Sequence, residues 1–379
     1  MNILKKSGSL TAFLLILLAS GCDQHEQLPR LKDTFKDLFY IGTALNYNQI
    51  MGKDKPSLNL VREQFNSITA ENVQKWEQIH PEPGVYHFEP ADSFTAFGER
   101  NHMYIVGHTL IWKNQTPSWV FLDSDGEPAS RDTLLARMRD HIMTVVGRYR
   151  GRIQGWDVIN EAFEDDGSLR ASGWLDIIGA DYIEKAFAWA HEADPDAKLF
   201  YNDFNMWKAG KRDAVIQLVR NLQAKNIRID AIGMQGHWGL DYPPLDDVEL
   251  AIKAYAALGV KVMISELDMD MLPLPGDYTG ADITQRVELK KALDPYANGL
   301  PDSMQTVIAD RYGAFFNLFC RNHESISRIT FWGVHDGLSW RNNWPVPGRT
   351  AYPLLFDRKL QPHKAFFTVI KSAETASLN

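Results

Sequence analysis

The sequence has only two cysteines, Cys22 and Cys320, among 379 residues, so at most one disulfide can form. This excludes a disulfide-stapled scaffold, and the stability of the fold must come from packing. Clusters of Lys and Arg are also missing. Forty basic residues are outnumbered by 48 acidic ones, which gives a formal net charge of -8. This balance argues against a nucleic-acid partner.

Linkers and phosphate-binding turns are absent as well. No stretch rich in Ser, Pro or Gly divides the body of the chain, and no glycine-rich turn follows an early strand pattern. A nucleotide-binding doubly wound sheet is therefore disfavoured. The sequence has the 45% hydrophobic content of a globular protein and eleven tryptophans, more than a core of this size needs. We expect some of the indole rings to face a ligand.

The first 21 residues have the pattern of a signal peptide. Lys5 and Lys6 precede an apolar run, Leu10 to Leu18, that is too short to cross the ~30 Å hydrocarbon core as a helix. The following residues, Ala-Ser-Gly-Cys ending at Cys22, resemble the lipobox of bacterial lipoproteins. We expect an exported protein anchored to a membrane through lipidated Cys22, at the periplasmic face or the cell surface. The alternative is an ordinary secreted protein with an unmodified cysteine.

Short apolar runs rich in β-branched residues alternate with helical patterns along the rest of the chain. The predicted strands cover residues 39–44, 67–70, 103–107, 153–159, 198–201, 231–234, 261–265 and 326–331. The predicted helices include residues 134–149, 181–193, 210–225, 245–258 and 304–321. Parallel strands need crossover helices, and eight strand–helix units close on themselves, so the sequence predicts an α/β fold of the (β/α)8 TIM-barrel type. An open doubly wound sheet is the alternative.

The predicted organisation is a signal peptide over residues 1–21, a polar linker over 22–33 and one (β/α)8 domain over 34–373. Within the domain, residues 272–303 are rich in Pro and Gly and contain only a short helical pattern near 284–293. Loops of this length in a compact domain usually form functional walls or lids. Because the loop follows the seventh strand, we expect it to border the face that carries the chemistry.

Polar or aromatic residues stand at the ends of most of the predicted strands. The loops after the strands of a (β/α)8 barrel share one mouth, where active sites lie. One polar residue after a strand is usually a turn or a cap, but convergence at so many strand ends indicates a binding site. These residues are Glu71, Asn72, His108, Asn160, Glu161, Asn202, Asp203, Gln235, His237, Glu266, Asp268 and Trp332.

Two of these residues, Glu161 and Glu266, lie in apolar strands and suit the hydrolysis of a glycosidic bond. That reaction needs one carboxylic acid to protonate the leaving oxygen and one carboxylate to attack the sugar carbon. The alternative is a pair of structural glutamates neutralised by Arg or Lys, but neither strand has an obvious basic neighbour in sequence. The set has no metal-ligand pattern, so we expect no metal and no cofactor.

The surroundings of the two glutamates predict their roles. The less solvated carboxyl keeps its proton, whereas the carboxyl with more hydrogen bonds stays ionised. His237 lies near the end of the sixth strand and Asp268 two residues after Glu266, so a string of Glu266, His237 and Asp268 would hold Glu266 ionised. We predict that Glu266 is the nucleophile and Glu161 the general acid/base.

Seven motifs in order resemble the endo-β-1,4-xylanases of glycoside hydrolase family 10. The similarity covers about residues 33–372, and each motif alone is moderately specific. The motifs are TAENVQKW (69–76), GHTLIWKNQ (107–115), WDVINE (156–161), YNDFN (201–205), QGH (235–237), ISELD (264–268) and FWGVHD (331–336), which leads to Ser339 and Trp340.

The resemblance implies a monomeric enzyme that hydrolyses xylan or xylo-oligosaccharides with retention of configuration. Glu266 would attack the anomeric carbon, and Glu161 would protonate the departing sugar and then activate water, with the carboxyls ~5–5.5 Å apart. Asn160 would bind the 2-hydroxyl of the reacting sugar. The predicted substrate-binding and supporting residues are Glu71, Asn72, Lys75, His108, Trp112, Gln115, Asn160, Phe204, Gln235, His237, Asp268, Trp332 and Trp340.

Five positions depart from the family pattern: Phe204 replaces a Tyr, Lys113 a His, Gln74 a Met, Gly236 a Ser and Trp238 an aliphatic residue. We expect Gly236 to open space beside the nucleophile and Trp238 to add a stacking ring on the leaving-group side. None of the five is a catalytic carboxylate. The departures therefore concern the strength of sugar subsites and leave the chemistry intact.

Two other functions stay open on the sequence alone. A β-1,4-glucanase on the same barrel would use the same two carboxylates, and a preference for aryl cellobioside over aryl xylobioside would identify it. The second alternative, from a different functional class, is a non-catalytic, carbohydrate-binding lipoprotein. The joint presence of Asn160, Glu161, His237 and Glu266 disfavours the non-catalytic protein.

Overall fold

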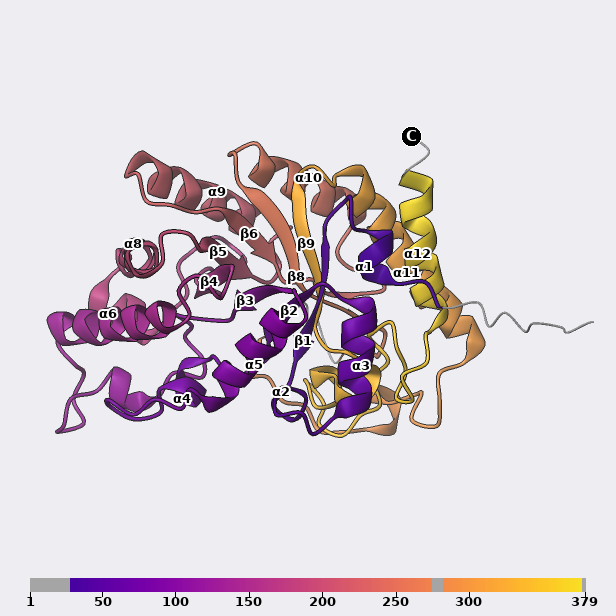
Figure 1. Ribbon diagram of the computed structural model, residues 1–379, viewed down its shortest axis with the longest axis horizontal. Coiled ribbons are helices and arrows are strands. Elements are labelled where there is room, and N and C mark those ends of the chain that lie inside the picture. Colours follow the sequence, from indigo (N-terminus) through magenta and orange to yellow (C-terminus); the bar gives the residue numbers. More distant parts are fainter. Residues whose placement is uncertain (1–27, 275–281, 377–379) are drawn as a thin grey trace, which may run out of the picture.

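The computed structural model describes residues 28–274 and 282–376 and contains a closed barrel of eight parallel strands (Figure 1). Pairing of β6 with β8 and of β9 with β1 closes the ring. The predicted (β/α)8 barrel is therefore confirmed. The barrel strands are β1 (Tyr40–Leu45), β2 (Ser67–Ala70), β3 (Tyr104–Gly107), β4 (Gly155–Asn160), β5 (Lys198–Asp203), β6 (Ala231–Met234), β8 (Lys261–Asp270) and β9 (Ile326–Phe331).

All eight predicted strands are present, and the main difference lies in β8. This strand continues to Asp270, five residues beyond its predicted end at 265. The extension exists because a short additional strand, β7 (His237–Gly239), pairs with it in parallel, His237 opposite Asp268. The extra pairing fixes His237 beside the part of β8 that carries Glu266 and Asp268.

Helices surround the barrel strands, and the five predicted helices agree with α6, α8, α9, α10 and α11 to within three residues at each end. The helix α6 begins three residues before its predicted start at 134, because Ser130 caps it by accepting a hydrogen bond from the Thr133 amide. The helices are α1 (Leu31–Thr34), α2 (Tyr47–Ile50), α3 (Lys55–Gln64), α4 (Trp76–Ile79), α5 (Glu89–Arg100), α6 (Arg131–Arg148), α7 (Gly173–Ile178), α8 (Tyr182–Ala193), α9 (Ala209–Ala224), α10 (Leu245–Ala256), α11 (Asp302–Arg321) and α12 (Lys364–Ala376).

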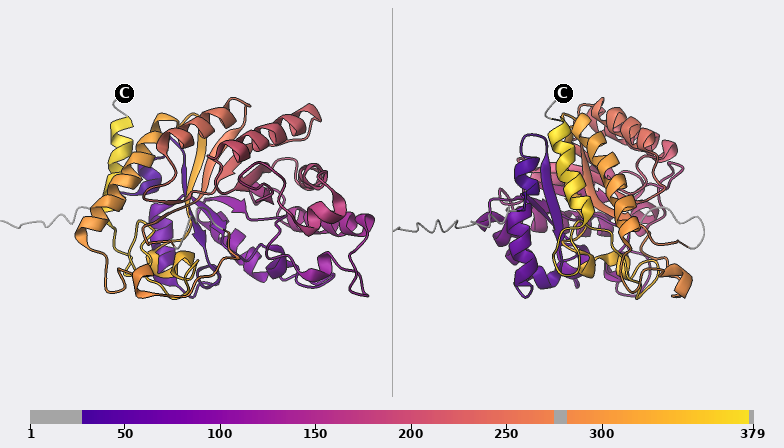
Figure 2. Two further views of the ribbon diagram at one scale, coloured as in Figure 1. Left: turned by 180° about the vertical axis from the view of Figure 1, so that it is seen from behind. Right: turned by 90° about the vertical axis from the view of Figure 1, so that its right-hand side faces the viewer.

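The core between α11 and the barrel is aromatic. Phe315, Phe316 and Phe319 are fully buried, and Phe316 stacks on Phe331 of β9 at a ring-centroid distance of 6.0 Å. Burial of each ring contributes roughly 2–3 kcal/mol before the entropy cost of ordering it. Val307 of the same helix is 46% exposed. The other face of α11 lies along α12 (Figure 2).

The packed domain begins earlier than the predicted linker end at residue 33. Leu31 of α1 is fully buried, and its amide donates to the side chain of Gln64 at 3.0 Å. The predicted signal peptide and Cys22 lie outside the described residues. Within residues 28–274 and 282–376, no helix has the length and apolar character needed to span a membrane.

The long loop after β8 contains no α-helix in its described part, although we expected a helical pattern near 284–293. Only a 3-10 turn, Lys291–Leu293, forms there, and residues 275–281 lie outside the described part. The loop is tied to the segment after β9, since the Trp344 indole donates to the Asp282 carbonyl at 2.9 Å.

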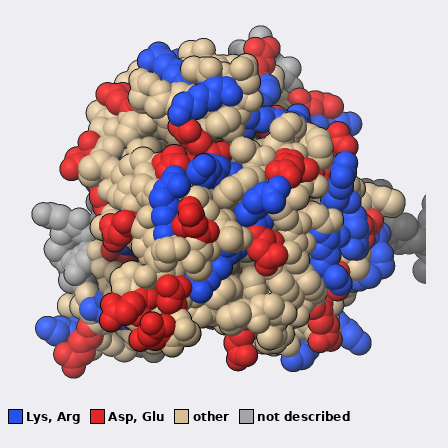
Figure 3. Space-filling model, turned by 90° about the vertical axis from the view of Figure 1, so that its left-hand side faces the viewer, with Lys and Arg blue, Asp and Glu red and all other residues tan. Residues whose placement is uncertain are grey.

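Both signs of charge are close together on the surface. On the face shown in Figure 3, Lys and Arg side chains are interspersed with Asp and Glu. Exposed ion pairs between α6 and the start or body of α8 include Arg139 with Glu192 at 2.6 Å and Arg131 with Asp181 at 2.7 Å. Such exposed pairs contribute little stability, typically below ~1 kcal/mol each.

Two buried histidines join α4 to α6. The Nδ1 atoms of His80 and His141 lie 3.3 Å apart, and His141 stacks on Trp76 with ring centroids 3.7 Å apart. Burial lowers the pKa of His80 to about 4, and burial together with the charge of His80 lowers the pKa of His141 well below its usual value. Both rings are therefore neutral in the folded protein near pH 6, whereas histidines in the unfolded chain begin to take up protons there.

We predict that this pair makes the fold sensitive to acid. Because folding lowers the pKa values of the two histidines, their contribution to the unfolding free energy is fully present above pH ~6.5 and is lost as the pH falls toward 4. Between pH 7 and 5 the unfolding free energy of the His141→Leu variant, measured by urea denaturation, should therefore fall by about 2 kcal/mol less than that of the wild type. His191→Leu, at an exposed histidine of α8, is the control. Equal pH slopes for wild type and His141→Leu would refute the prediction.

Candidate active site

A pocket at the carboxyl ends of the barrel strands gathers most of the predicted site residues. Ile283, from the long loop after β8, is its one unpredicted lining residue and makes the loop a wall of the site, as expected. The lining residues are Lys75, His108, Trp112, Asn160, Glu161, Gln235, His237, Glu266, Ile283, Trp332 and Trp340.

Glu161, directly after β4, is held by two neutral donors. The Trp112 indole donates to Oε2 at 2.8 Å, and the Gln235 amide donates to Oε1 at 2.9 Å. The Arg170 guanidinium lies 3.7 Å from Oε2, so a basic partner exists although the sequence did not reveal it. Burial, reinforced by the charge of Asp203, outweighs these groups and raises the pKa of Glu161.

The backbone at Glu161 is in the left-handed region, with φ of 58°. A non-glycine residue adopts this conformation at a cost of roughly 1–2 kcal/mol. The Glu161 amide compensates in part by donating to the Asn202 carbonyl at 2.8 Å. This turn places the side chain between Trp112 and Gln235, over the mouth of the barrel.

Glu266 of β8 has charged as well as neutral donors. The Asn202 amide donates to Oε1 at 2.7 Å, and His237 Nε2 lies 3.1 Å from Oε2. Burial would raise the pKa of Glu266, but the hydrogen bond from His237, the charges of His108 and His237, and the bond from Asn202 together lower it. The two glutamates thus share one pocket while their pKa values move in opposite directions.

Asp268 lies behind His237, away from the pocket. His237 Nδ1 is 3.1 Å from Asp268 Oδ2, and the Trp340 indole donates to the same oxygen at 2.6 Å. Arg341 donates to Asp268 Oδ1 at 2.9 and 3.0 Å. Burial opposes ionisation of Asp268, but Arg341 and His237 lower its pKa to about 2. The carboxylate in turn raises the pKa of His237 despite burial, so the predicted string of Glu266, His237 and Asp268 is present.

A network of amides and one hydroxyl joins the two glutamates. Asn160 Oδ1 accepts from Asn202 at 3.0 Å and from Gln235 at 3.4 Å, which leaves the Asn160 amide nitrogen as its donor to the pocket. Ser265 donates to Asn202 Oδ1 at 2.5 Å and fixes the orientation of that side chain.

A second group of polar side chains surrounds Lys75, which lines the pocket. Its ammonium donates to Asn72 at 3.0 Å and to Gln115 at 2.9 Å, and it lies 4.8 Å from the centre of the Trp112 ring. Burial lowers the pKa of Lys75 and raises the pKa of Glu71. The predicted residues that follow β2 and β3 are therefore brought together next to the carboxylates.

Aromatic rings form another wall of the pocket. Trp332 packs edge-on against His108 at 5.3 Å, and Trp340 stacks on Trp344 at 4.6 Å. His108 Nδ1 lies 2.9 Å from Asp157 Oδ2, which fixes the ring. Both predicted tryptophans therefore reach the pocket from the segment after β9.

Two expectations about the departures from the family pattern are wrong. Trp238 is 2% exposed and stacks on Phe315 of α11 at 4.4 Å, because its strand β7 turns this side chain into the core. Gly236 opens no space, since a Cβ there would lie 2.8 Å from Ile264 Cγ2, and its φ of 89° explains the glycine.

Phe204 does not line the pocket. Its ring lies 4.7 Å from the Arg170 guanidinium and 4.1 Å from the Lys211 ammonium. The ring therefore supports Arg170, which in turn stands beside Glu161.

From the sequence alone, no role in the site was assigned to Asn202, Ser265, Arg170 or Arg341. Asn202 was among the strand-end residues expected at the mouth of the barrel, and that position was the signal for it. The other three are found only in the folded structure: Ser265 acts through Asn202, Arg170 comes from the loop after β4, and Arg341 follows β9 by ten residues.

The comparisons with known proteins agree with this geometry. The profile of glycosyl hydrolase family 10 matches residues 30–372. Endo-1,4-beta-xylanase A of Xylanibacter ruminicola is 45% identical over 361 residues, which cover 95% of this chain and 97% of the relative.

Two solved structures are also similar. A GH10 endoxylanase from a sugarcane soil metagenome is 45% identical with a TM-score of 0.88, and the match covers 90% of this chain and 99% of that one. TsXylA, an intracellular xylanase of Thermoanaerobacterium saccharolyticum, is 36% identical with a TM-score of 0.78, over 91% and 99% of the two chains. That structure is of a mutant in complex with xylotriose. This chain belongs to glycosyl hydrolase family 10.

Proposed function

We propose that the protein is an endo-1,4-β-xylanase that cleaves xylan or xylo-oligosaccharides with retention of configuration. The observation that carries the proposal is the pair of glutamates in one pocket, with the pKa of Glu161 raised and that of Glu266 lowered. A retaining glycosidase needs such a pair, one carboxyl protonated and one ionised. The names of the family relatives support a xylan substrate.

In the first step Glu266 attacks the anomeric carbon while Glu161 protonates the departing sugar oxygen. Asn202 and His237 hold the attacking carboxylate in place and keep it ionised. The proton of Glu161 is retained because its environment is buried and adjacent to the Asp203 charge. The bond to the leaving sugar breaks as the bond to Glu266 forms, which gives a covalent glycosyl-enzyme.

In the second step Glu161, now ionised, takes a proton from water, and the hydroxide displaces Glu266. The Arg170 guanidinium at 3.7 Å and the donors Trp112 and Gln235 stabilise this ionised form. Glu161 therefore serves as the acid in the first step and as the base in the second.

The substrate is held by the residues around the two glutamates. The amide nitrogen of Asn160 is placed to donate to the 2-hydroxyl of the reacting sugar, a bond that strengthens in the oxocarbenium-like transition state. The Lys75 group offers donors and acceptors for neighbouring hydroxyls on the non-reducing side. Trp332 and Trp340 offer indole faces to the pyranose ring.

The roles of the glutamates predict different chemical rescue. On an aryl β-xylobioside, Glu266→Ala and Glu161→Ala should each lower turnover on the order of 10³-fold or more. Azide should restore activity to Glu266→Ala by direct attack and give the glycosyl azide of inverted configuration. With Glu161→Ala, azide can only intercept the glycosyl-enzyme and give the retained product. Wild-type activity in Glu266→Ala, or inverted azide from Glu161→Ala, would contradict the assignment.

The hydrogen bond from His237 predicts a change in pH dependence. Glu266 must be ionised to attack, so activity falls as the pH drops through its pKa. Because His237 lowers that pKa, His237→Asn should move the acidic limb of kcat/KM to higher pH and leave the alkaline limb, set by Glu161, in place. His102→Asn, at an exposed histidine with φ of 53°, is the control. An unmoved acidic limb in His237→Asn would count against the role of His237.

We also propose that the protein is a lipoprotein held at a membrane through Cys22. The support is the sequence alone: the apolar run before it and the lipobox-like residues from Leu18 to Cys22. Cys320, the other cysteine, is buried and its pKa is raised to about 12, so it is poorly suited to modification.

Lipidation predicts how the protein fractionates. In a bacterial host that makes lipoproteins, the wild type should sediment with membranes and incorporate labelled palmitate, whereas Cys22→Ala should do neither. Cys320→Ala should behave like the wild type. Palmitate labelling of Cys22→Ala would place the lipid on another residue, and a wild type without label would contradict lipidation.

A further inference from the structure

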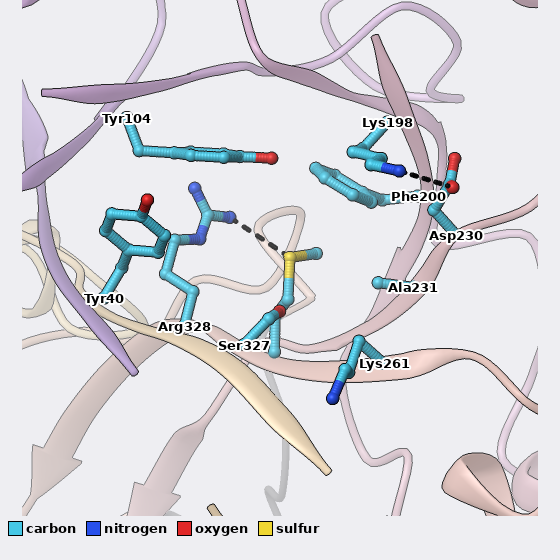
Figure 4. Close-up of a pocket in the computed structure, with 10 residues that line it drawn as sticks. Tyr40, Tyr104, Lys198, Phe200, Asp230, Ala231, Lys261, Ser327 and Arg328 are labelled. Carbon is cyan, nitrogen blue, oxygen red and sulfur yellow. Dashed lines mark hydrogen bonds and ion pairs between the residues drawn. The ribbon is translucent and has the colours of Figure 1, made fainter. Parts of the chain in front are cut away.

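A second cavity lies at the opposite end of the barrel from the active site. Five of its lining residues are the first residues of β1, β3, β5, β6 and β8, so it opens where the strands begin. Its volume of about 320 Å³ falls within the range of small-ligand sites. The lining residues, drawn in Figure 4, are Tyr40, Tyr104, Lys198, Phe200, Asp230, Ala231, Lys261, Met263, Ser327 and Arg328.

Arg328 of β9 places a cation without a partner in this cavity. Its side chain is 2% exposed, and Nη2 contacts only the Met263 sulfur, at 3.6 Å. Within the described residues, Nε and Nη1 have no hydrogen-bond partner and the guanidinium pairs with no carboxylate. A buried, unpaired charge costs several kcal/mol. Burial accordingly lowers the pKa of Arg328, although the charge of Asp157 opposes this.

Most of the other polar side chains in the cavity lining already have partners. Lys198 lies 3.4 Å from Asp230, the Tyr104 hydroxyl donates to the Gln154 carbonyl at 3.4 Å, and Lys261 donates to the Glu324 carbonyl. Ser327 donates to the Val262 carbonyl at 3.4 Å. Only the guanidinium is both buried and unsatisfied. With three cations and one carboxylate in the lining, the cavity favours an anion.

The walls on both sides of the guanidinium are apolar. The rings of Tyr40 and Tyr104 lie 5.1 Å apart, and Phe200 and Met263 add further apolar surface. Figure 4 shows the head of Arg328 pointing into the cavity next to these two tyrosines, with Phe200 farther across. The strand register explains the grouping, because Arg328 lies opposite Tyr40 on β1 and opposite Met263 on β8.

We propose that this cavity binds a small monocarboxylate with an apolar ring. The carboxylate accepts charge-assisted hydrogen bonds from the Arg328 guanidinium, whose Nε and Nη1 have no partner within the described residues, and the ring packs against Tyr40, Tyr104 and Phe200. An acidic sugar fits less well, because its many hydroxyls need hydrogen-bonding partners and most of those in the lining are already used.

The test is calorimetric titration of the folded wild-type protein with benzoate. We expect saturable 1:1 binding that a saturating xylo-oligosaccharide does not displace, since the two pockets lie at opposite ends of the barrel. Benzamide, the neutral analogue, glucuronate and inorganic phosphate should each bind at least about tenfold more weakly. Failure of benzoate to bind at up to ~10 mM, displacement by the xylo-oligosaccharide, or equal binding of any of the three analogues would overturn the proposal.

Variants at the two kinds of lining residue complete the test. Arg328→Met should weaken benzoate binding at least about tenfold, and Arg328→Lys should weaken it less. Tyr40→Ala removes a wall without touching the buried charge and should also weaken binding while xylan hydrolysis is unchanged. The control is Tyr47→Ala, at a tyrosine of similar exposure, 48% against 45%, outside the cavity. Wild-type benzoate affinity in Arg328→Met or in Tyr40→Ala would refute the site.

Discussion

The structure depends on one electrostatic constraint: two buried carboxyls in the same pocket must hold different protonation states. Two ionised carboxylates in so dry a place would repel each other, and two neutral ones would leave no nucleophile. Glu266 is therefore given a cationic donor and an amide, and Glu161 is given two neutral donors and a nearby carboxylate. The remaining features of the mouth follow from this division.

The positive charge of His237, beside Glu266, depends on groups on the far side of its ring. His237 stays charged because Asp268 lies on its other side, and Asp268 stays ionised because Arg341 donates to it twice. Arg341 and Arg349 also share Asp270, at 3.2 and 2.7 Å. These fully buried pairs tie the segment after β9 to the extended end of β8, so a loop distant in sequence controls the charge of the nucleophile.

The sequence was sufficient for the barrel because each strand was a short apolar run between helical patterns of the right length. It was also sufficient for most of the pocket, since the carboxyl ends of parallel strands must converge. It was insufficient where the direction of a side chain depends on local strand pairing. The strand β7 turns Trp238 into the core, although we expected this departure from the family pattern to add a stacking ring on the leaving-group side. Arg170 and Arg341 could not be predicted because they reach the site from loops whose paths no pattern fixes.

The central claim is that Glu266 forms a covalent bond to the sugar while Glu161 does not. The most direct measurement is mass spectrometry of peptides after reaction with an aryl 2-deoxy-2-fluoro-β-xylobioside. Its fluorine slows both steps while its good leaving group lets the first proceed, so the glycosyl-enzyme accumulates. The account predicts one added fluoroxylobiosyl group, on the peptide that contains Glu266. The same group on Glu161, or inactivation without a covalent adduct, would contradict it.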